Sequence, residues 1–170
     1  LGLSHQVVYS ILQDSKEVFW IGTKNGLTRY DQATPRGKSY QYYFQKDGLS
    51  NDSVFTLFED SRGVIWAGTG EGFATYNPNK ISGSSITFSP VTKIGKEKLN
   101  KIGSVIEDRN GDIWLGCWAG LGAYKYNPNK NRYYRFTTQN GLVGDNVISM
   151  FIDQEKNLWY GTYGMGVSKL

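Results

Sequence analysis

The sequence predicts an all-β fold of the β-propeller class, and three observations support this prediction. A string of eleven residues, such as "EDSRGVIWAGT" at 59–69, recurs four times at intervals of about 45 residues, the length of one propeller blade. Each copy is written as short apolar segments separated by turn residues. Aromatic residues make up 15% of the chain and Gly occurs 21 times, which is typical of short, tightly turned strands and not of a disordered chain.

Five columns of residues stay in register around a recurring tryptophan. The tryptophans are Trp20, Trp66, Trp114 and Trp159, separated by 46, 48 and 45 residues. An Asp lies six residues before each one and a Gly two residues after: Asp14, Asp60, Asp108 and Asp153, and Gly22, Gly68, Gly116 and Gly161. A branched apolar residue and a small hydroxyl residue lie further upstream: Val8, Val54, Ile102 and Val147, and Ser10, Thr56, Ser104 and Ser149. Chance does not hold five columns in step four times, so the repeat is structural.

Each unit predicts four strands in order. The run at 53–60, "SVFTLFED", is a nearly continuous apolar segment, typical of a strand covered on both faces. A polar turn follows, in which the Asp can accept hydrogen bonds from backbone amides without any catalytic role. The β-branched and aromatic run at 64–69 predicts a second strand, and a Gly-containing turn leads to a third at 73–78. Aromatic stretches at 40–44, 85–89 and 132–136 predict a fourth, outer strand.

The repeated Trp and Gly have a structural interpretation. Large flat side chains can fill the wedge between neighbouring blades, so all four tryptophans are predicted to lie in the core rather than to form a ligand platform. The Gly after each Trp is predicted to let the backbone turn tightly and to let neighbouring sheets approach each other.

Composition excludes several other classes. No apolar run is long enough to span a bilayer. The net charge of +4 is spread along the chain, and its one dense spot, at 93–101, is interpreted as a solvated loop containing Lys93, Lys96, Lys98 and Lys101. No basic stripe or recognition motif predicts nucleic-acid binding. One cysteine, Cys117, excludes an internal disulfide and a cysteine-based zinc site, and no cofactor, metal or catalytic residue is predicted.

The segment at 48–78, "GLSNDSVFTLFEDSRGVIWAGTGEGFATYNP", resembles the two-component regulator propeller repeat. That repeat has a Gly-Leu start, an Asp-Ser-x-Gly turn, a Trp-x-Gly-Thr strand and a Gly-Leu-x-x-Tyr third strand. All four units match, so the resemblance covers residues 1–170. The third unit departs from the pattern because it lacks the Gly-Leu start, replaces the Thr with Cys117 and adds Trp118.

The resemblance implies a periplasmic or extracytoplasmic sensor segment of a bacterial membrane-bound regulator, often a hybrid histidine kinase. Propellers of this family are similar to ligand-sensing modules for polysaccharide breakdown products, and the repeat carries no catalytic motif. Contact with a membrane is expected only through segments outside this chain.

The chain is predicted to be one propeller segment, residues 1–170, with blades at about 1–46, 47–92, 93–138 and 139–170. The last blade stops after its third strand, so we expect a piece of a larger propeller. Exposed sheet edges invite pairing, and self-association through these edges is a further expectation.

Two sets of loops are predicted to share one face and to carry any ligand site, because loops on a rigid scaffold commonly hold binding residues. One set precedes each first strand and the other joins the second and third strands. The candidate ligand-binding residues are Lys24, Asn51, Asp52, Glu71, Asn100, Lys101, Trp118, Asp145, Asn146 and Tyr163. Trp118 and Tyr163 are extra aromatics whose faces could stack on sugar rings, although packing against a neighbouring blade remains an alternative. His5, the only histidine, is not expected to contribute.

The sequence therefore favours a non-enzymatic sensor that recognises a carbohydrate-type ligand through these loops. The first alternative is a structural or protein-binding propeller. The second is a polysaccharide lyase or glycoside hydrolase, for which Glu71 with Asp52 or Asp145 would be the carboxylate pair. The repeated aspartates cannot serve in such a pair, because their turns lie at the opposite end of the strands from the loops.

Overall fold

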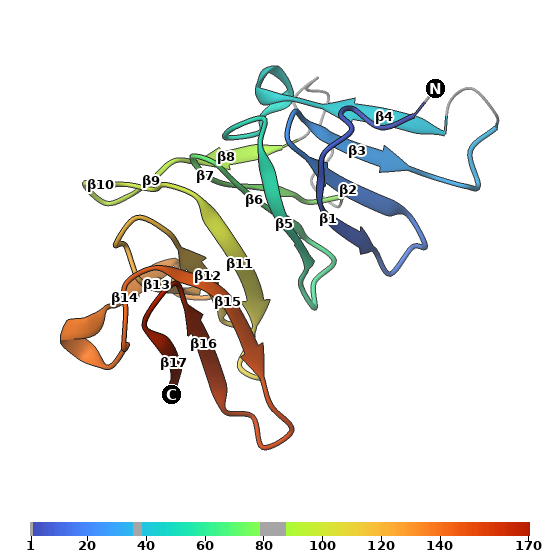
Figure 1. Cartoon of the computed structure of the whole chain (residues 1–170). Coiled ribbons are helices and arrows are strands. Elements are labelled where there is room, and N and C mark those ends of the chain that lie inside the picture. The colour runs from blue at the N-terminus through green and yellow to red at the C-terminus, as the bar shows by residue number, and fades with distance from the viewer. Residues whose placement is uncertain (1, 36–38, 79–87) are drawn as a thin grey trace.

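A computed structural model describes residues 2–35, 39–78 and 88–170 of the chain. Four antiparallel sheets follow one another in chain order along an arc, with the two termini at its opposite ends (Figure 1). The first sheet contains β1 (Val8–Gln13), β2 (Phe19–Thr23), β3 (Leu27–Tyr30) and β4 (Tyr40–Tyr43). The second contains β5 (Val54–Glu59), β6 (Ile65–Thr69), β7 (Gly72–Tyr76) and β8 (Ser89–Val91).

The third sheet contains β11 (Ile102–Glu107), β12 (Ile113–Cys117), β13 (Ala123–Asn127) and β14 (Arg132–Phe136). The fourth contains β15 (Val147–Ile152), β16 (Leu158–Thr162) and β17 (Gly166–Lys169). The first strands β1, β5, β11 and β15 contact one another in succession on the inner side of the arc. This order of antiparallel sheets around a common side is the propeller arrangement that the sequence predicts.

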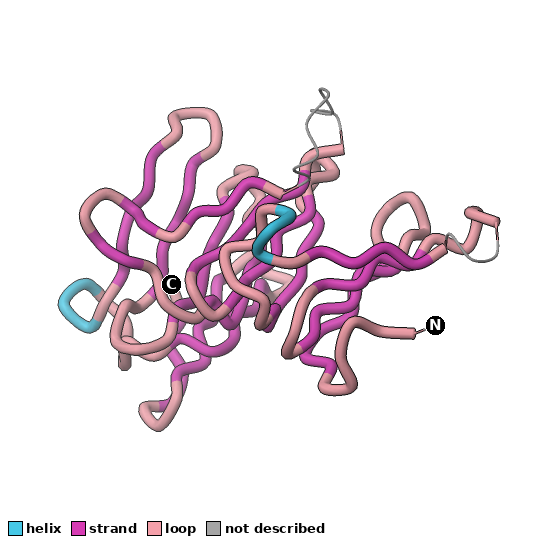
Figure 2. The backbone as a smooth tube through the Cα atoms, turned by 90° about the horizontal axis from the view of Figure 1, so that it is seen from above, coloured by secondary structure: helices cyan, strands magenta, loops and turns pink. Residues whose placement is uncertain are grey.

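The connections between sheets are short. Two 3₁₀ helices, η1 (Gln45–Asp47) and η2 (Thr138–Asn140), follow the outer strands of the first and third sheets (Figure 2). A small hairpin of β9 (Lys93–Ile94) and β10 (Glu97–Lys98) connects the second sheet to the third. No helix in the described part of the chain is long and apolar enough to cross a membrane.

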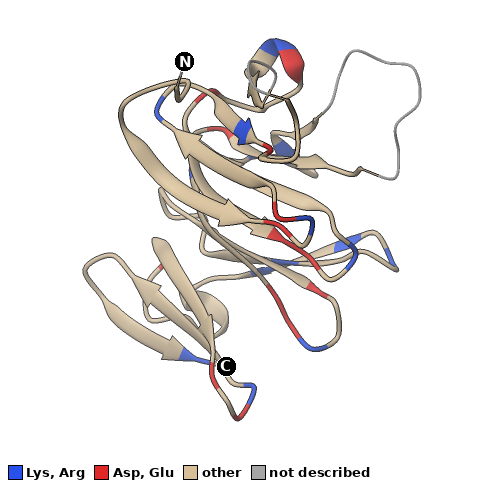
Figure 3. Ribbon diagram, turned by 90° about the vertical axis from the view of Figure 1, so that its right-hand side faces the viewer, with Lys and Arg blue, Asp and Glu red and all other residues tan. Residues whose placement is uncertain are grey.

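The strand predictions are confirmed for the first three strands of each unit and for the outer strands at 40–44 and 132–136. The outer strand predicted at 85–89 falls largely on residues 85–87, which lie outside the described residues, and β8 begins at Ser89. The lysine-rich segment is not the simple solvated loop that was predicted, because Lys93 and Lys98 pair across the β9–β10 hairpin. Figure 3 shows basic and acidic residues interspersed along the chain rather than gathered on one face.

The Gly, Ser/Thr and Val/Ile columns meet where one sheet approaches the next. Thr56 pairs directly with Gly68 across β5 and β6, and a Cβ atom on Gly68 would lie 2.5 Å from the Thr56 methyl group. The same Cβ would lie 2.9 Å from the carbonyl oxygen of Ile102 in the following sheet. The predicted close approach of sheets is therefore present. The predicted tight turn is wrong, because Gly68 lies inside a strand and its φ is not positive.

Replacing Gly68 with alanine is expected to lower the free energy of unfolding by about 1–3 kcal/mol, because an added methyl group meets backbone atoms that cannot move aside independently. Urea unfolding measures the loss. Gly2→Ala is the control, since nothing lies within 4 Å of a Cβ at that position. Equal stability of Gly68→Ala and the unmodified chain would contradict this explanation of the Gly column.

Each repeated Asp ties its turn to the Trp of the same unit. The Asp14 carboxylate accepts hydrogen bonds from the backbone amides of Lys16 and Val18, both at 2.9 Å, as predicted for a turn Asp. Its second oxygen accepts the indole N–H of Trp20 at 2.8 Å, which the sequence did not predict. The same indole bond is present in the other three units, at 3.0, 2.9 and 2.7 Å. The six-residue spacing of Asp and Trp is the spacing of this bond.

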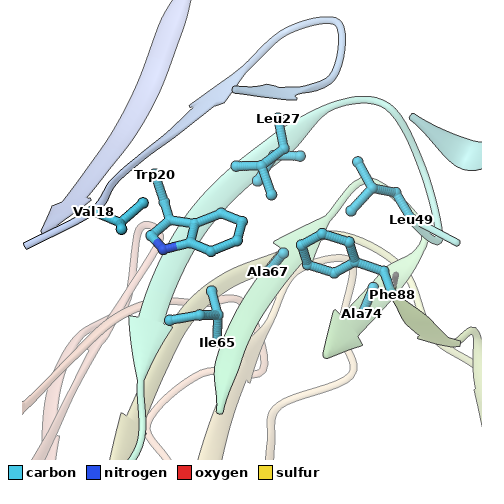
Figure 4. Packing of buried hydrophobic residues seen from close by; sticks show 9 residues of the cluster. Val18, Trp20, Leu27, Leu49, Ile65, Ala67, Ala74 and Phe88 are labelled. Atoms are coloured by element: carbon cyan, nitrogen blue, oxygen red, sulfur yellow. The ribbon is translucent and has the colours of Figure 1, made fainter. Parts of the chain in front are cut away.

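The tryptophans pack against the sheet that follows their own. Trp20 of the first sheet lies over Ile65 and Ala67 of the second and beside Phe88 (Figure 4). Trp20, Trp66 and Trp114 are buried, with 1%, 3% and 6% of their surface exposed. Trp159 is only half-buried, because it belongs to the last described sheet and no further described sheet covers it. The prediction that all four tryptophans are core is thus wrong for Trp159.

Acid is expected to destabilise the fold between pH about 4 and about 2. The indole hydrogen bond from Trp159 lowers the pKa of Asp153 from 3.8 to about 2, with further help from Asn157 and against the opposing effect of burial. Burial raises the pKa of Asp60, but hydrogen bonds from Arg62 and Trp66 outweigh it, so that pKa also lies below its ordinary value.

A carboxylate with a lowered pKa in the folded state stabilises the protein fully above its unfolded pKa, and this contribution is lost as the pH falls through the folded pKa. Urea unfolding at a series of pH values should therefore show a stability that is level above pH about 4 and falls steeply below it. A stability that stays level down to pH about 2 would show that these carboxylates keep no lowered pKa in solution.

Candidate functional site

The two predicted loop sets meet at one end of the sheets. In each unit, the residue that opens the turn between the second and third strands donates its backbone N–H to a carbonyl oxygen. The acceptor is the residue directly before the first strand of the same unit. These bonds are Lys24 to Val7 at 3.0 Å, Gly70 to Ser53 at 3.0 Å, Trp118 to Lys101 at 3.0 Å and Tyr163 to Asn146 at 2.9 Å. The repeated aspartates occupy the turns at the opposite strand ends, as predicted.

The loop face also joins each sheet to the next. The amide of Gly26 in the first unit donates to the carbonyl oxygen of Asp52 in the second, at 2.6 Å. Gly72 donates in the same way to Asn100 at 3.0 Å, and Gly122 to Asp145 at 2.8 Å. Loops that interlock in this manner hold the candidate residues of different units at fixed relative positions.

A row of aromatic rings crosses this face from the first sheet to the last. Tyr9 on β1 and Phe55 on β5 have ring centroids 4.8 Å apart. Further along, Trp118 in the β12–β13 turn stacks on Tyr163 in the β16–β17 turn, with centroids 6.2 Å apart and an interplanar angle of 23°. Tyr163 is 67% exposed and Tyr9 42% exposed, so the row presents aromatic surface to solvent. We use the name aromatic row for these four rings together with Lys101, which lies between two of them: Tyr9, Phe55, Lys101, Trp118 and Tyr163.

Lys101 connects the two halves of the row. Its Nζ lies 3.9 Å from the ring centroid of Phe55 and 3.8 Å from that of Trp118. Both distances are well inside the range of a cation–π interaction. Burial against these rings lowers the pKa of Lys101 below its ordinary value of 10.5. Lys101, predicted from the sequence both to lie in a solvated loop and to be a candidate ligand-binding residue, is therefore part of the candidate site.

Trp118 occupies space that a missing side chain leaves open. The positions after the branched apolar column are Tyr9, Phe55, Gly103 and Ile148, so the third unit lacks a side chain where the first two carry an aromatic ring. A Cβ on Gly103 would lie 2.5 Å from the indole nitrogen of Trp118. The additional Trp of the third unit thus restores an aromatic ring beside the inner strand and continues the row.

The remaining predicted residues hold the loops. Asp52 accepts the amide of Gln45 at 2.7 Å, and Asp145 accepts the amide of Thr138 at 2.6 Å. Asn51 accepts the amide of Ser53 at 2.9 Å, and Asn146 accepts the amide of Gly120 at 2.9 Å.

Three candidates lie on the surface of the same face. Glu71 pairs with Lys98 at 3.5 Å, with both side chains about half exposed. Lys24 and Asn100 are exposed, and their carbonyl oxygens accept hydrogen bonds from the Ser53 hydroxyl and the Gly72 amide. The structure therefore brings only Lys101, Trp118 and Tyr163 of the predicted residues into side-chain contact with one another along the row.

Tyr9 and Phe55 were not among the predicted site residues. Their signal in the sequence is weak, because an aromatic residue inside a strand is typical of a core position. Comparison of the four units offers a better signal: the same column holds Tyr, Phe, Gly and Ile, and the unit with Gly carries the additional Trp118.

Neither a cluster of metal ligands nor an exposed thiol lies on the described part of this face. No group of three metal-ligating side chains occurs among the residues that the structure describes. Cys117 is buried beside the row, and burial raises the pKa of its thiol to about 12, so the thiol stays protonated at neutral pH. A cavity of about 200 Å³ lies away from this face, between Trp114 and the fourth sheet, and is lined in part by Asp108, Lys156 and Leu170.

Comparison with solved structures shows two relatives of similar sequence. The chain is 27% identical to the extracellular domain of the putative hybrid two-component system BT3049 from B. thetaiotaomicron, with a TM-score of 0.81. It is 26% identical to the corresponding domain of BT4673 from the same organism, with a TM-score of 0.76. Each match covers 99% of this chain and 21% or 22% of the other, so the chain spans about a fifth of their length.

More distant structures share the fold alone. PorZ of Porphyromonas gingivalis, a surface component of the type-IX secretion system, is 17% identical over 96% of this chain and 25% of its own, with a TM-score of 0.72. Virginiamycin B lyase from Staphylococcus aureus is 16% identical over the whole of this chain and 58% of its own, with a TM-score of 0.65. No curated protein matches the chain.

The repeat itself matches a family model four times. The matched residues are 2–25, 48–71, 97–119 and 141–164, together more than half of the chain. Each match contains the Asp–Trp pair of one unit, the loop before its first strand and the beginning of the turn between its second and third strands. With the fold, the register and this match in agreement, the chain belongs to the two-component regulator propeller family.

Proposed function

We propose that this chain is a non-enzymatic, ligand-sensing segment of a bacterial two-component regulator, and that it binds a carbohydrate along the aromatic row. The observation that carries the proposal is the stacked pair of Trp118 and Tyr163 on the loop face, with Tyr163 67% exposed. Sugar rings present flat C–H faces that pack on aromatic rings, while their hydroxyl groups need polar partners at the edges.

The position of the row suits a sensor. Its rings come from all four sheets, so a ligand lying along it contacts sheets whose relative positions are held by packing and by loop hydrogen bonds. A ligand changes an equilibrium between two arrangements only by its different affinity for them. A ligand that contacts several sheets binds more tightly to the arrangement in which those sheets fit it best, and so favours that arrangement. The change in arrangement would then be passed to a kinase or regulator elsewhere in the protein. The similar extracellular domains support a periplasmic location.

The carboxylates on this face favour binding over hydrolysis. A glycosidase needs two carboxyl groups that are free to act on the scissile bond. Here the side chains of Asp52 and Asp145 accept backbone amides of their own loops, and Glu71 pairs with Lys98. These partners give each carboxylate a structural role.

The test is isothermal titration of this chain with a panel of plant and host oligosaccharides, both neutral and acidic, followed by Tyr163→Ala. Loss of one stacked ring is expected to weaken binding by about tenfold. Tyr134→Ala is the matched control, because Tyr134 is also exposed, at 47%, but lies on the outer strand β14. Equal affinities for the two variants would place the ligand elsewhere, and no binding by any oligosaccharide would overturn the carbohydrate proposal.

A second proposal, self-association, rests on the two ends of the arc. Ile11 on the first sheet is 67% exposed, while Val105 at the same position of the third unit is 4% exposed. Phe151 on the last sheet is 64% exposed, whereas the equivalent Leu12 packs into the core between the first two sheets. The first sheet thus presents the face that a preceding sheet covers in other units, and the last presents the face that a following sheet covers.

Because these two faces are complementary by the repeat, two copies of the chain could pack end to end. Analytical ultracentrifugation over a wide range of concentrations tests this, with Ile11→Glu as the disrupting variant. A concentration-dependent dimer that Ile11→Glu abolishes supports the proposal. A monomer at all concentrations contradicts it.

A further inference from the structure

The aromatic row contains a cation whose electrostatic partner is missing from the described residues. The ammonium group of Lys101 lies against Phe55 and Trp118, and it forms no ion pair or hydrogen bond with any residue that the structure describes. Two aromatic rings contribute negative π faces but no charge, so they attract the ammonium group without neutralising it.

Among the described residues, five other cations lie over a ring, each over a single ring and at 5.2–5.9 Å from its centroid, whereas Lys101 lies within 4 Å of two. Two of the five, Lys46 and Lys169, also lack an ion pair with any described residue, and the others pair with a carboxylate. Arg29 lies over Trp20 and also pairs with Asp31 at 3.0 Å. Lys125 lies over Trp114 and also pairs with Asp112 at 2.8 Å. In these scaffold positions the chain supplies the carboxylate itself. At Lys101, on the loop face, it supplies a second ring instead.

The two rings partly desolvate the Lys101 ammonium group. Contact with two rings removes water from the ammonium group, which is why the pKa of Lys101 is lowered. The side chain is nevertheless only partly buried, so part of it remains open to solvent. An anion that approached from the open side would complete a charge-assisted hydrogen bond in a setting that already excludes part of the water.

We propose that Lys101 is an anion subsite within the aromatic row, and that the chain prefers an acidic saccharide, one carrying a carboxylate or a sulfate ester, over a neutral one. This inference rests on the proposed function, since it assigns a ligand class to the same row. Trp118 and Tyr163 would stack on the sugar rings while Lys101 binds the negative group of a neighbouring unit of the ligand.

The test compares ligands that differ only in charge. One pair is an oligogalacturonide and its fully methyl-esterified form, and the other is a sulfated disaccharide and its desulfated form. Titration of the unmodified chain should show that at least one acidic member binds about tenfold or more tightly than its neutral partner. The pair that shows the preference identifies whether the anion is a carboxylate or a sulfate.

Three variants assign the preference to one side chain. Lys101→Met should abolish the preference, so that the ratio of the affinities for the acidic and the neutral partner falls to about one, and Lys101→Arg should retain it. Lys130→Met removes the same charge from an exposed position on the outer turn and should leave the preference unchanged. A thermal unfolding curve for each variant confirms that it is folded.

The outcomes separate this inference from the function on which it rests. Equal binding of acidic and neutral partners by the unmodified chain would overturn the anion subsite and leave carbohydrate binding standing. A preference that survives in Lys101→Met would also overturn it, because the anion would then have another partner. No binding of any of the four saccharides would overturn both proposals.

Discussion

Replacing Trp66 with alanine is expected to lower the free energy of unfolding by about 3–5 kcal/mol, while the same change at Trp159 costs much less. The two residues occupy the same column of the repeat and donate the same indole hydrogen bond, at 3.0 and 2.7 Å. They differ in packing: Trp66 is 3% exposed and contacts Phe73 and Tyr126, whereas Trp159 is half-buried. The comparison therefore isolates the contribution of burial between sheets from that of the hydrogen bond.

Urea unfolding of both variants measures the difference, and the expected loss for Trp159→Ala is about 1–2 kcal/mol, in line with the smaller apolar area removed from water. Trp66→Phe serves as a further control, because it removes the indole bond but keeps a smaller aromatic ring in the wedge, so its loss should be smaller than that of Trp66→Ala. Equal losses for Trp66→Ala and Trp159→Ala would show that inter-sheet packing does not dominate the role of this column.

The sequence predicts the strands of this fold well because the repeat fixes their register. Once Trp20 and its three equivalents are aligned, turn residues at constant offsets mark the strand ends in every unit. The Asp of the turn was correctly interpreted as an acceptor of backbone amides. Its bond to the indole was not predicted, because the distance between Asp and Trp depends on the twist of the hairpin as well as on their spacing.

The candidate site is harder to predict because its members come from different units. Phe55, Lys101 and Trp118 belong to three separate segments, and only the stacking of sheets and the interlocking loops bring them together. Column-by-column reasoning treats residues at equal offsets as equivalent, whereas this site arises from a difference between units: Gly103 replaces an aromatic residue, and Trp118 enters from a neighbouring turn. Lys101 was recognised as a candidate, but its contacts with two rings were not.

The exposed ends of the arc illustrate another limit. Column membership predicts that Trp159 is core, and it would be if a following sheet covered it as the second sheet covers Trp20. Burial is a property of a residue and its neighbours together, so identical positions in a repeat differ where the neighbours differ. The fractional exposures of Ile11 and Phe151 follow the same reasoning.

Replacing Asp60 with alanine is expected to lower the free energy of unfolding by about 2–4 kcal/mol, because several donors lose one buried acceptor together. Its Oδ1 accepts the amides of Arg62 and Val64, both at 3.0 Å, and its Oδ2 accepts the indole N–H of Trp66 at 3.0 Å. The Asp60 side chain has no exposed surface, so water cannot replace these bonds without opening the structure.

Two further variants separate the parts of this arrangement. Asp60→Asn keeps one acceptor oxygen, which can serve either the turn amides or the indole but not both, so its loss should be smaller than that of Asp60→Ala. Asp153→Ala removes the equivalent carboxylate at a half-buried position, where water reaches the turn, and its loss should also be smaller.

Hydrogen exchange of the Trp66 indole provides a readout that is independent of global stability. Because the indole N–H is buried and bonded only to Asp60, its exchange should become much faster in Asp60→Ala, while exchange of the Trp20 indole, bonded to Asp14, should change only as far as global stability does. Unchanged exchange at Trp66 would mean that the Asp does not hold the ring. The repeated Asp would then be explained by the turn amides alone, and the constant spacing of Asp and Trp would have no physical cause in the indole bond.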